Sequence, residues 1–268
     1  MIRLLLLSWL VLWPAAGLAQ STGLIALTDR EDLLGWEAVG RLDLDGSGFC
    51  TGTLIAPDLV LTAAHCVYKG GTGALLPGSA VTFRAGLQNG AAIAESTVSQ
   101  IAAHPGYQPG QGLTLDNVRH DVALLRLTSP ITSRDADPFV LHSGAIRDTD
   151  ISVTSYGQGR AETLSRQRKC RIVGQQGGVI AFDCNVTFGS SGAPVFAQVG
   201  NRGRILSIVS GGGRSNGEIV GLGMMLPQVV ADLKAQLRRS PGPGNRQPIR
   251  RITLGDRRDG TGAKFVRP

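Results

Sequence analysis

Short runs of β-forming residues, separated by glycine and polar turns, are the feature that most limits what this chain can fold into. Examples lie at residues 52–55, 59–62, 81–84, 123–127 and 205–210. Many short strands with frequent turn signals predict an all-β sandwich or barrel. The 37 glycines agree with this prediction, because corners and bulges of barrels use glycine.

A polar connection at residues 128–138 contains two prolines and divides these strand-like runs into two halves. After the second half, Pro227 opens a run whose apolar residues repeat at helical spacing. Proline suits the first turn of a helix, since its missing N–H is not needed there. The pattern therefore predicts two β halves followed by a helix over residues 227–237.

The N-terminal residues differ in composition from the strand-like body. Residues 1–19 combine a basic start, an apolar run that Pro14 interrupts and small residues at Gly17 and Ala19. This is the pattern of a secretory signal peptide, whereas a membrane anchor needs about 20 apolar residues. We therefore expect cleavage after Ala19 and a secreted or periplasmic protein. Residues 20–35 are a polar lead, either a propeptide or an N-terminal arm packed on the domain.

The net charge of +7 comes from the C-terminal end. Nine Lys and Arg but two Asp and Glu lie between Arg238 and Pro268, while the rest of the chain has 18 of each kind. Residues 239–268 cannot bury a core and are predicted to be disordered. Such a tail is a candidate for weak binding of acidic surfaces, although a solvated or trimmed appendage is the commoner case. No specific nucleic-acid partner is expected.

Three separate stretches carry the side chains that a nucleophilic hydrolase needs. Ser191 lies in a Gly-x-Ser-Gly-x-Pro run, in which glycines let the backbone approach a substrate closely, although such runs also occur in ordinary turns. His65 lies in the stretch at residues 61–66, and Asp121 directly precedes the strand-like residues 122–127. A serine hydroxyl needs a base within reach, imidazole can take and return its proton, and a carboxylate can fix the imidazole tautomer.

Together, in this chain order of His, Asp and Ser, the stretches resemble the trypsin-like serine proteases of the chymotrypsin fold. The resemblance covers roughly residues 39–237. It implies two packed six-stranded antiparallel β-barrels with a C-terminal α-helix, forming one peptidase domain over residues 36–238. It also implies that His65, Asp121 and Ser191 form a catalytic triad, with the backbone N–H groups of Gly189 and Ser191 as the oxyanion hole.

Other serine, aspartate and histidine residues are alternative candidates for these roles. Ser190 is adjacent to Ser191, and Asp116 is close to Asp121, but neither holds the family position. The remaining histidines, His104, His120 and His142, are expected to have structural roles. His120 is next to Asp121, but adjacent strand residues point to opposite faces, so it is not expected to be the base.

The four cysteines allow three pairings in an oxidising compartment. The resemblance favours Cys50 with Cys66, which would attach the histidine loop to the preceding strand, and Cys170 with Cys184, which would brace the loop before Ser191. A metal site is disfavoured, since no Cys-x-x-Cys spacing occurs and His65 has a better use.

Substrate recognition follows from the same resemblance. Residues 210–212 would pair with the substrate backbone as an added strand, and Ser210 would also support Asp121. Asn185 stands, by its offset from Ser191, where trypsin has an acidic residue, so strict trypsin specificity is not expected. The implied pocket is polar, uncharged and open-walled, and its residues are Asn185, Thr187, Ser210, Gly211, Gly212 and Gly221. Arg214 could favour an acidic side chain, although solvation is its commoner role.

The sequence departs from the family pattern in the features that activate trypsin-type zymogens. Ser190 replaces the aspartate that pairs with a freed N-terminus in trypsin-type zymogens, and the usual Arg-then-Ile-Val-Gly-Gly cleavage sequence is missing. The run Gly-Ser-Ser-Gly-Ala-Pro looks closer to bacterial glutamyl-endopeptidase-like members. Activation by that N-terminal ion pair is therefore not expected.

The expected function is an exported serine endopeptidase that acts through an acyl-enzyme on protein or peptide substrates. The alternative is a catalytically silent binding protein on the same fold. An α/β-hydrolase is excluded because no βαβ alternation occurs and the serine comes last in the chain. We expect a monomer, with neither cofactor nor metal implied.

Overall fold

The computed structural model describes residues 23–239 except residues 47, 147–148, 200–201 and 216. The predicted signal peptide and the basic tail after Arg239 lie outside the described residues. No helix within the described ranges is long and apolar enough to span a bilayer.

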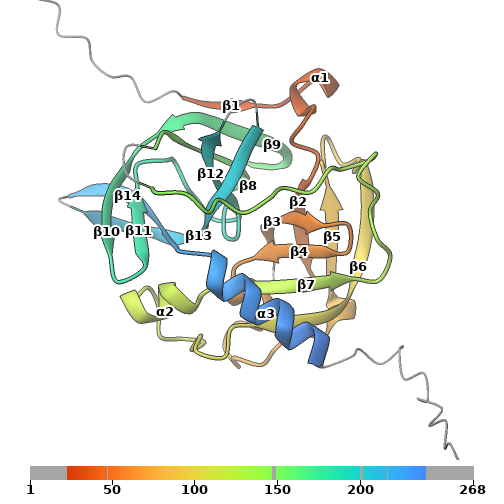
Figure 1. Ribbon diagram of the computed structural model, residues 1–268. Helices are drawn as coiled ribbons and strands as arrows, with labels where there is room; N and C mark the ends of the chain where they lie inside the picture. The colour runs from red at the N-terminus through yellow and green to blue at the C-terminus, as the bar shows by residue number, and fades with distance from the viewer. Residues whose placement is uncertain (1–22, 47, 147–148, 200–201, 216, 240–268) are drawn as a thin grey trace, which may run out of the picture.

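The first half of the body is a closed barrel of six antiparallel strands, shown in orange to green in Figure 1. Its strands, hydrogen bonded in the order β2-β3-β4-β7-β6-β5, are β2 (Val39–Leu44), β3 (Gly48–Ala56), β4 (Leu59–Thr62), β5 (Val81–Ala85), β6 (Ala94–Ala103) and β7 (Ala123–Leu127). Alternate side chains of each strand point into the barrel and fill it. On β5, Val81, Phe83 and Ala85 are fully buried, while the residues between them are half-buried.

The second half is an antiparallel sheet of eight strands in the order β1-β9-β8-β12-β13-β14-β11-β10. These strands are β1 (Leu24–Ala26), β8 (Ile151–Gly157), β9 (Arg160–Cys170), β10 (Ile172–Gln176), β11 (Val179–Phe182), β12 (Pro194–Val199), β13 (Arg202–Ser215) and β14 (Glu218–Met224). The chymotrypsin-like fold is confirmed. The second half differs in detail from the six-stranded barrel expected: it is a sheet of eight strands, and β1 from the N-terminal lead is one of the added strands, at the edge of β9.

The described part of that lead packs on the domain as an arm. Leu24 of β1 lies opposite Gln167 of β9, and Leu27 and Leu33 are buried. The short helix α1 (Arg30–Leu33) precedes Trp36, whose ring contacts buried aromatic rings of the second half. The lead therefore contributes to the hydrophobic core.

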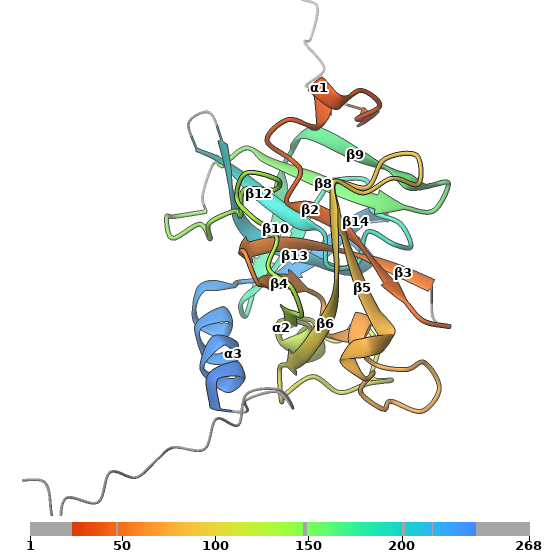
Figure 2. The same ribbon diagram turned by 90° about the vertical axis from the view of Figure 1, so that its right-hand side faces the viewer.

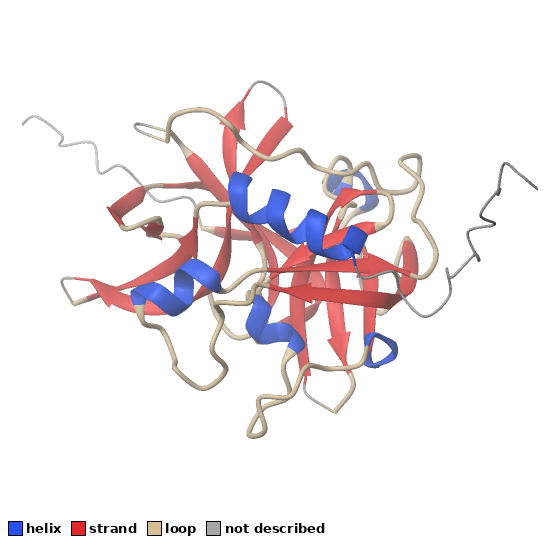
Figure 3. Cartoon of the chain, turned by 60° about the horizontal axis from the view of Figure 1, so that its bottom comes forward, coloured by secondary structure: helices blue, strands red, loops and turns tan. Residues whose placement is uncertain are grey.

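The helices lie at the periphery of the strands, as Figure 3 shows. Besides α1, they are α2 (Leu115–His120), α3 (Pro227–Arg239) and the 3-10 turns η1 (Ala64–Val67) and η2 (Gly78–Ala80). The predicted closing helix is α3, which begins at Pro227 and buries Val230, Leu233 and Leu237 against β6 and β7 of the first barrel. It thus ties the end of the domain to its first half.

Thr51 of β3 joins the two halves at one buried point. Its hydroxyl accepts from the N–H of Tyr156 on β8 at 3.1 Å and donates to the carbonyl of Gly189 at 2.8 Å. The Tyr156 hydroxyl donates in turn to the carbonyl of Leu87, at 2.9 Å, after β5. Figure 2 shows β2 and β3 beside β8 at this junction. These bonds place the loop around residue 190 against the first barrel.

Candidate active site

His65 and Asp121 meet at one end of the first barrel. His65 lies on η1 directly after β4, and Asp121 follows the last residue of α2. Nδ1 of His65 is 2.7 Å from Oδ2 of Asp121, and the backbone N–H of His65 donates to Oδ1 at 2.8 Å. The Asp121 side chain is only 4% exposed. A carboxylate held there keeps the proton on Nδ1 and leaves Nε2 free to accept a proton.

Ser210 on β13 completes the surroundings of Asp121. Its hydroxyl donates to Oδ2 at 2.5 Å. Hydrogen bonds to a carboxylate are stronger than those between neutral groups. The aspartate thus accepts three hydrogen bonds from two chain segments far apart in sequence, which fixes its orientation toward His65.

The Ser191 loop is held by strands of both halves. The N–H of Thr51 donates to the carbonyl of Ser191 at 2.8 Å, and the N–H of Gly192 donates to the carbonyl of Val209 at 2.7 Å. Within the described residues, the N–H groups of Gly189 and Ser191 donate to no protein acceptor. They are therefore free to bind an oxygen of another molecule.

Glycine is required on each side of this serine. Gly189 has a φ of +88° and Gly192 a φ of +76°, in the left-handed region that favours glycine. A Cβ on Gly192 would lie 2.1 Å from Oγ1 of Thr62, and one on Gly189 would lie 2.2 Å from the Phe49 ring. The glycines flanking the serine pair in the sequence thus allow the loop to lie flat on the barrel.

Ser191 and His65 line one cavity of about 1160 Å³ between the two halves. The other residues in its wall that the sequence predicts for catalysis or substrate binding are Asp121, Thr187, Gly189, Ser210, Gly211 and Gly212. Two predicted residues lie elsewhere: Asn185 is exposed outside this wall, and Gly221 is buried beneath the ring of Phe182.

Sequence reasoning missed several residues of the wall. Val186 lines the cavity in place of Asn185, whose N–H donates instead to Oε1 of Gln167 at 2.7 Å. Leu113 packs against Gly211 from the loop before α2, and Phe188 stands at the rim with 83% of its surface exposed. The sequence signal for Val186 is its apolar side chain next to the expected position, because an apolar residue is more readily placed in a pocket wall than an exposed amide.

Ser190, the serine next to Ser191, is part of the buried hydrogen-bond network of the domain. It is fully buried and absent from the cavity wall. Its hydroxyl donates to the carbonyl of Tyr156 at 3.1 Å and accepts from the N–H of Thr187 at 3.3 Å and from Nη2 of Arg160 at 3.2 Å. Of the two adjacent serines, Ser191 is therefore the one whose hydroxyl is available to a ligand.

Arg160 places a cation beneath the serine loop. Besides Ser190, its guanidinium donates to the carbonyl of Ser155 and, at 2.9 Å, to the hydroxyl of Ser155. All these partners are neutral, and burial lowers the pKa of Arg160 to about 10. The group remains charged at neutral pH, and its positive charge faces no carboxylate among these contacts.

The other histidines lie outside the cavity wall. His104 and His120 stack at 4.5 Å, and Nδ1 of His120 is 3.7 Å from a carboxylate oxygen of Asp116. His120 ends α2, so the strand alternation used to set it aside does not apply; its stacking on His104 separates it from the cavity instead. His142 contacts the carbonyl of Ala145 at 3.2 Å.

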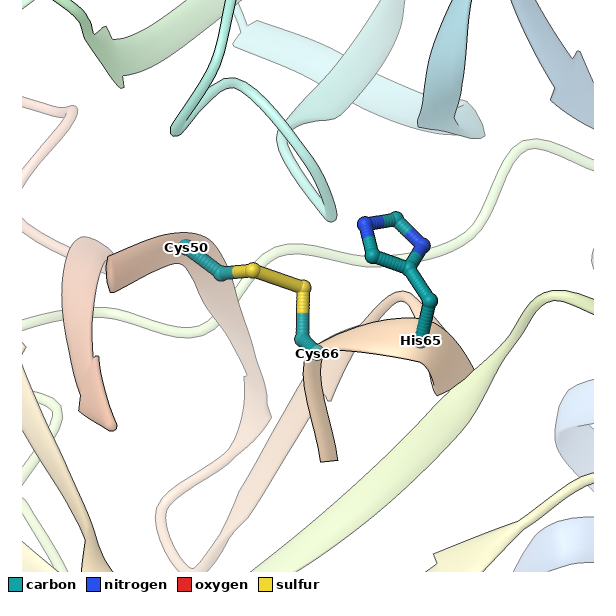
Figure 4. Close-up of side chains that lie close together, drawn as sticks. All are labelled: Cys50, His65 and Cys66. Atoms are coloured by element: carbon teal, nitrogen blue, oxygen red, sulfur yellow. A yellow bond between two sulfur atoms is a disulfide. The ribbon is translucent and has the colours of Figure 1, made fainter. Parts of the chain in front are cut away.

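Both disulfides that the resemblance implied are present, Cys50–Cys66 and Cys170–Cys184. The first attaches η1, which carries His65, to β3 (Figure 4). Ligand atoms of Cys50, His65 and Cys66 lie within 4.8 Å of one another, a spacing that would suit a metal ion. The two sulfurs are bonded to each other, however, and zinc binds thiolates. The cluster is therefore a disulfide next to His65 and does not offer the thiolates of a zinc site.

A six-stranded closed barrel, a second antiparallel sheet and a C-terminal helix define the class of chymotrypsin-like proteins. The trypsin family model matches residues 33–226. The chain therefore belongs to the trypsin family.

Solved structures share this fold at low sequence identity. A Glu endopeptidase in complex with MPD is 18% identical, with a TM-score of 0.65, over 82% of this chain and 98% of its own. The protease Anisep from Arthrobacter nicotinovorans is 22% identical, with a TM-score of 0.59, over 76% of this chain and 96% of its own. At these identities the likeness shows the fold.

Curated relatives are serine proteases that the chain matches over part of their length. Serine protease SP24D of Anopheles gambiae is 28% identical over 65% of this chain and 60% of its own length. Serine protease 56 of Mus musculus is 28% identical over 82% of this chain and 39% of its own length. The chain thus spans less than two thirds of either relative.

Proposed function

We propose that this protein is an exported serine endopeptidase that hydrolyses peptide bonds through an acyl-enzyme at Ser191. The observation that carries the proposal is the bond between His65 Nδ1 and the buried carboxylate of Asp121, in a cavity that Ser191 also lines. The trypsin family and the serine protease relatives support the same reaction class. The two disulfides and the predicted signal peptide support export to an oxidising compartment.

Asp121 keeps a proton on Nδ1 of His65, so that Nε2 is the nitrogen that takes up the Ser191 proton during the reaction. Nε2 of His65 takes the proton of the Ser191 hydroxyl as Oγ attacks the substrate carbonyl carbon, and the resulting imidazolium is stabilised by Asp121. The imidazolium then gives the proton to the leaving amine as the peptide C–N bond breaks. Water repeats the sequence on the acyl-enzyme, releasing the carboxylic acid and restoring Ser191.

The negative charge of the tetrahedral intermediate would be bound by the N–H groups of Gly189 and Ser191. Both are unused within the described protein, and donors fixed in place cost no reorganisation during the reaction. Removing one such donor costs about 10²–10³ in turnover in comparable sites.

The substrate backbone would bind as an added strand along the end of β13. Residues 211–215 pair with β14 on one side, while the pairing with β12 ends at Ile208. An extended peptide can hydrogen bond to the other edge of this segment. That edge leads directly from Ser210, beside Asp121, into the cavity.

Hydrolysis of a mixed peptide library, followed by mass spectrometry, tests the proposal. Wild-type protein should release new peptides, whereas Ser191→Ala and His65→Ala should reduce the rate by more than about 10³-fold. His142→Ala is the matched control, because His142 lies outside the cavity wall. Equal activity of Ser191→Ala and wild type would refute the proposal, and an inactive, folded wild type would favour the binding protein.

A further inference from the structure

We infer that the pocket beside Ser191 selects peptides with a small aliphatic side chain on the acyl side of the scissile bond, because Val186 lines the pocket and the buried cluster that contains the Phe182 ring packs behind it. The inference rests on the proposed function and adds the substrate class to it.

The position of Phe182 follows from strand register. Phe182 on β11 pairs with Gly221 on β14, and Gly221 pairs with Gly212 on β13. Residues directly opposite each other in antiparallel strands point to the same face of a sheet. A Cβ on Gly221 would lie 2.2 Å from the Phe182 ring. The ring therefore covers Gly221 and extends toward the strand that carries Gly212.

This face of the sheet is the face of the pocket. Gly212 lines the cavity, and a Cβ on it would meet Cγ2 of Val186, another wall residue, at 3.8 Å. Phe182 and Val186 belong to the same hydrophobic cluster of the second half. Phe182 itself is fully buried and reaches no part of the cavity surface. The wall of the pocket at Val186 is thus backed by the packed hydrocarbon of this cluster.

The charges around the cavity do not suit an ionised substrate side chain in this pocket. Among the described wall residues, the acidic one is Asp121, whose carboxylate is engaged by His65 and Ser210, and the basic one is Lys69, next to η1. Asn185, the amide expected at the base, is exposed outside the wall. A charged side chain would be desolvated there without a partner.

Small aliphatic side chains match this shape and chemistry. Alanine or valine can contact Val186 and Gly212 without displacing the Phe182 ring. A larger side chain must move that ring, whose neighbours close-pack the core. A misfit of one methylene in an apolar pocket changes discrimination by about 10–200-fold.

Two measurements separate this inference from the proposed function. The first is kcat/KM of wild type on tetrapeptide anilides that end in Ala, Val, Phe, Lys or Glu. The second is calorimetric binding of peptide acids with the same five terminal residues to Ser191→Ala, which needs no turnover. Ala and Val should exceed Phe, Lys and Glu by at least about tenfold in both.

The outcomes differ for the two claims. If wild type cleaves but prefers Phe, Lys or Glu, the pocket inference is wrong and the protease proposal stands. If wild type cleaves nothing while Ser191→Ala binds Ala and Val peptides preferentially, the pocket inference stands and the protease proposal is wrong. Binding without any preference among the five peptides overturns the inference in either case.

Variants at adjacent positions locate the base of the pocket. Val186→Asp should raise cleavage of Lys peptides relative to Ala peptides by at least about tenfold, because it adds a carboxylate to the wall. Asn185→Asp is the matched control, expected to change the ratio less than about twofold. The reverse result, with Asn185→Asp acquiring the Lys preference, would overturn the inference. Phe182→Leu should raise the Phe-to-Ala ratio, and should it fail to fold, the Val186 and Asn185 pair still decides.

Discussion

Nη2 of Arg160 lies 3.2 Å from Oγ of Ser190, the residue directly before Ser191. The same guanidinium also binds the carbonyl and hydroxyl of Ser155, and all three acceptors are neutral. A buried polar network of this kind is rigid when every member is satisfied. Arg160 therefore supports from beneath the backbone between Gly189 and Ser191, whose N–H groups are the proposed oxyanion donors.

Replacing Arg160 tests this support. Arg160→Met removes the guanidinium that joins the Ser190 and Ser155 oxygens, so the N–H groups of the loop should lose their alignment. We expect kcat to fall by about 10–100-fold with KM changed less than about threefold, because the loss is confined to the transition state. Arg160→Lys, which keeps a cationic donor, should recover part of kcat. A rise in KM with unchanged kcat would contradict this role.

Gly192 and Gly159 share a positive φ, of +76° and +78°, but differ in their surroundings. A Cβ on Gly192 would lie 2.3 Å from the carbonyl oxygen of Thr51, whereas a Cβ on Gly159 would have nothing within 4 Å. Gly192→Ala should therefore abolish activity and lower the thermal midpoint strongly. Gly159→Ala should cost only the backbone strain, about 1–2 kcal/mol. Similar melting curves for the two variants would show that the contact at Gly192 is unimportant.

The N-terminal arm should contribute to stability. Leu33 is 1% exposed and Leu34 is 59% exposed, so the two leucines form a matched pair on one segment. Leu33→Ala should reduce the free energy of unfolding by about 2–5 kcal/mol. Leu34→Ala should change it by less than about 0.5 kcal/mol, as surface substitutions do. Denaturant unfolding measures both, and equal effects would mean that the arm does not pack on the domain in solution.

His104 should make the fold less stable in mild acid. Burial and the neighbouring His120 lower the pKa of His104, although Asp232 on α3 opposes the shift. Because its folded pKa lies below the ordinary value of about 6.5, the unfolded chain binds the proton first as the pH falls. Stability from this group is thus present above pH 6.5 and is lost below it.

Thermal unfolding at pH 7.5 and pH 5.5 measures that loss. His104→Asn keeps an acceptor for the N–H of Gly106, which bonds to His104 Nδ1 at 3.0 Å, but removes the titrating group. The variant should show a smaller drop in thermal midpoint between the two pH values than wild type. An unchanged drop would assign the acid sensitivity to other groups.

The sequence predicted those parts of the fold and site that depend on local pattern. Alternating short strands, the helix that begins at Pro227 and the stretches around His65 and Ser191 each contain their own signal. The three-residue strand β1 could not be predicted, since its pairing depends on a free edge of β9. The offset from Ser191 places Asn185 in the pocket, but in the structure Val186 occupies the wall instead. The contact between Arg160 and Ser190 joins residues 30 apart and leaves no local pattern.

Labelling with a serine-directed fluorophosphonate, followed by peptide mapping, tests the central claim most directly. An activated hydroxyl displaces fluoride from phosphorus, so the label marks a serine that a base deprotonates. We predict one label per molecule of mature protein, on Ser191, with none on Ser190 and none in the His65→Ala or Ser191→Ala variants. A folded wild-type protein with both disulfides intact that takes no label at Ser191, or that is labelled equally after His65→Ala, would contradict the account.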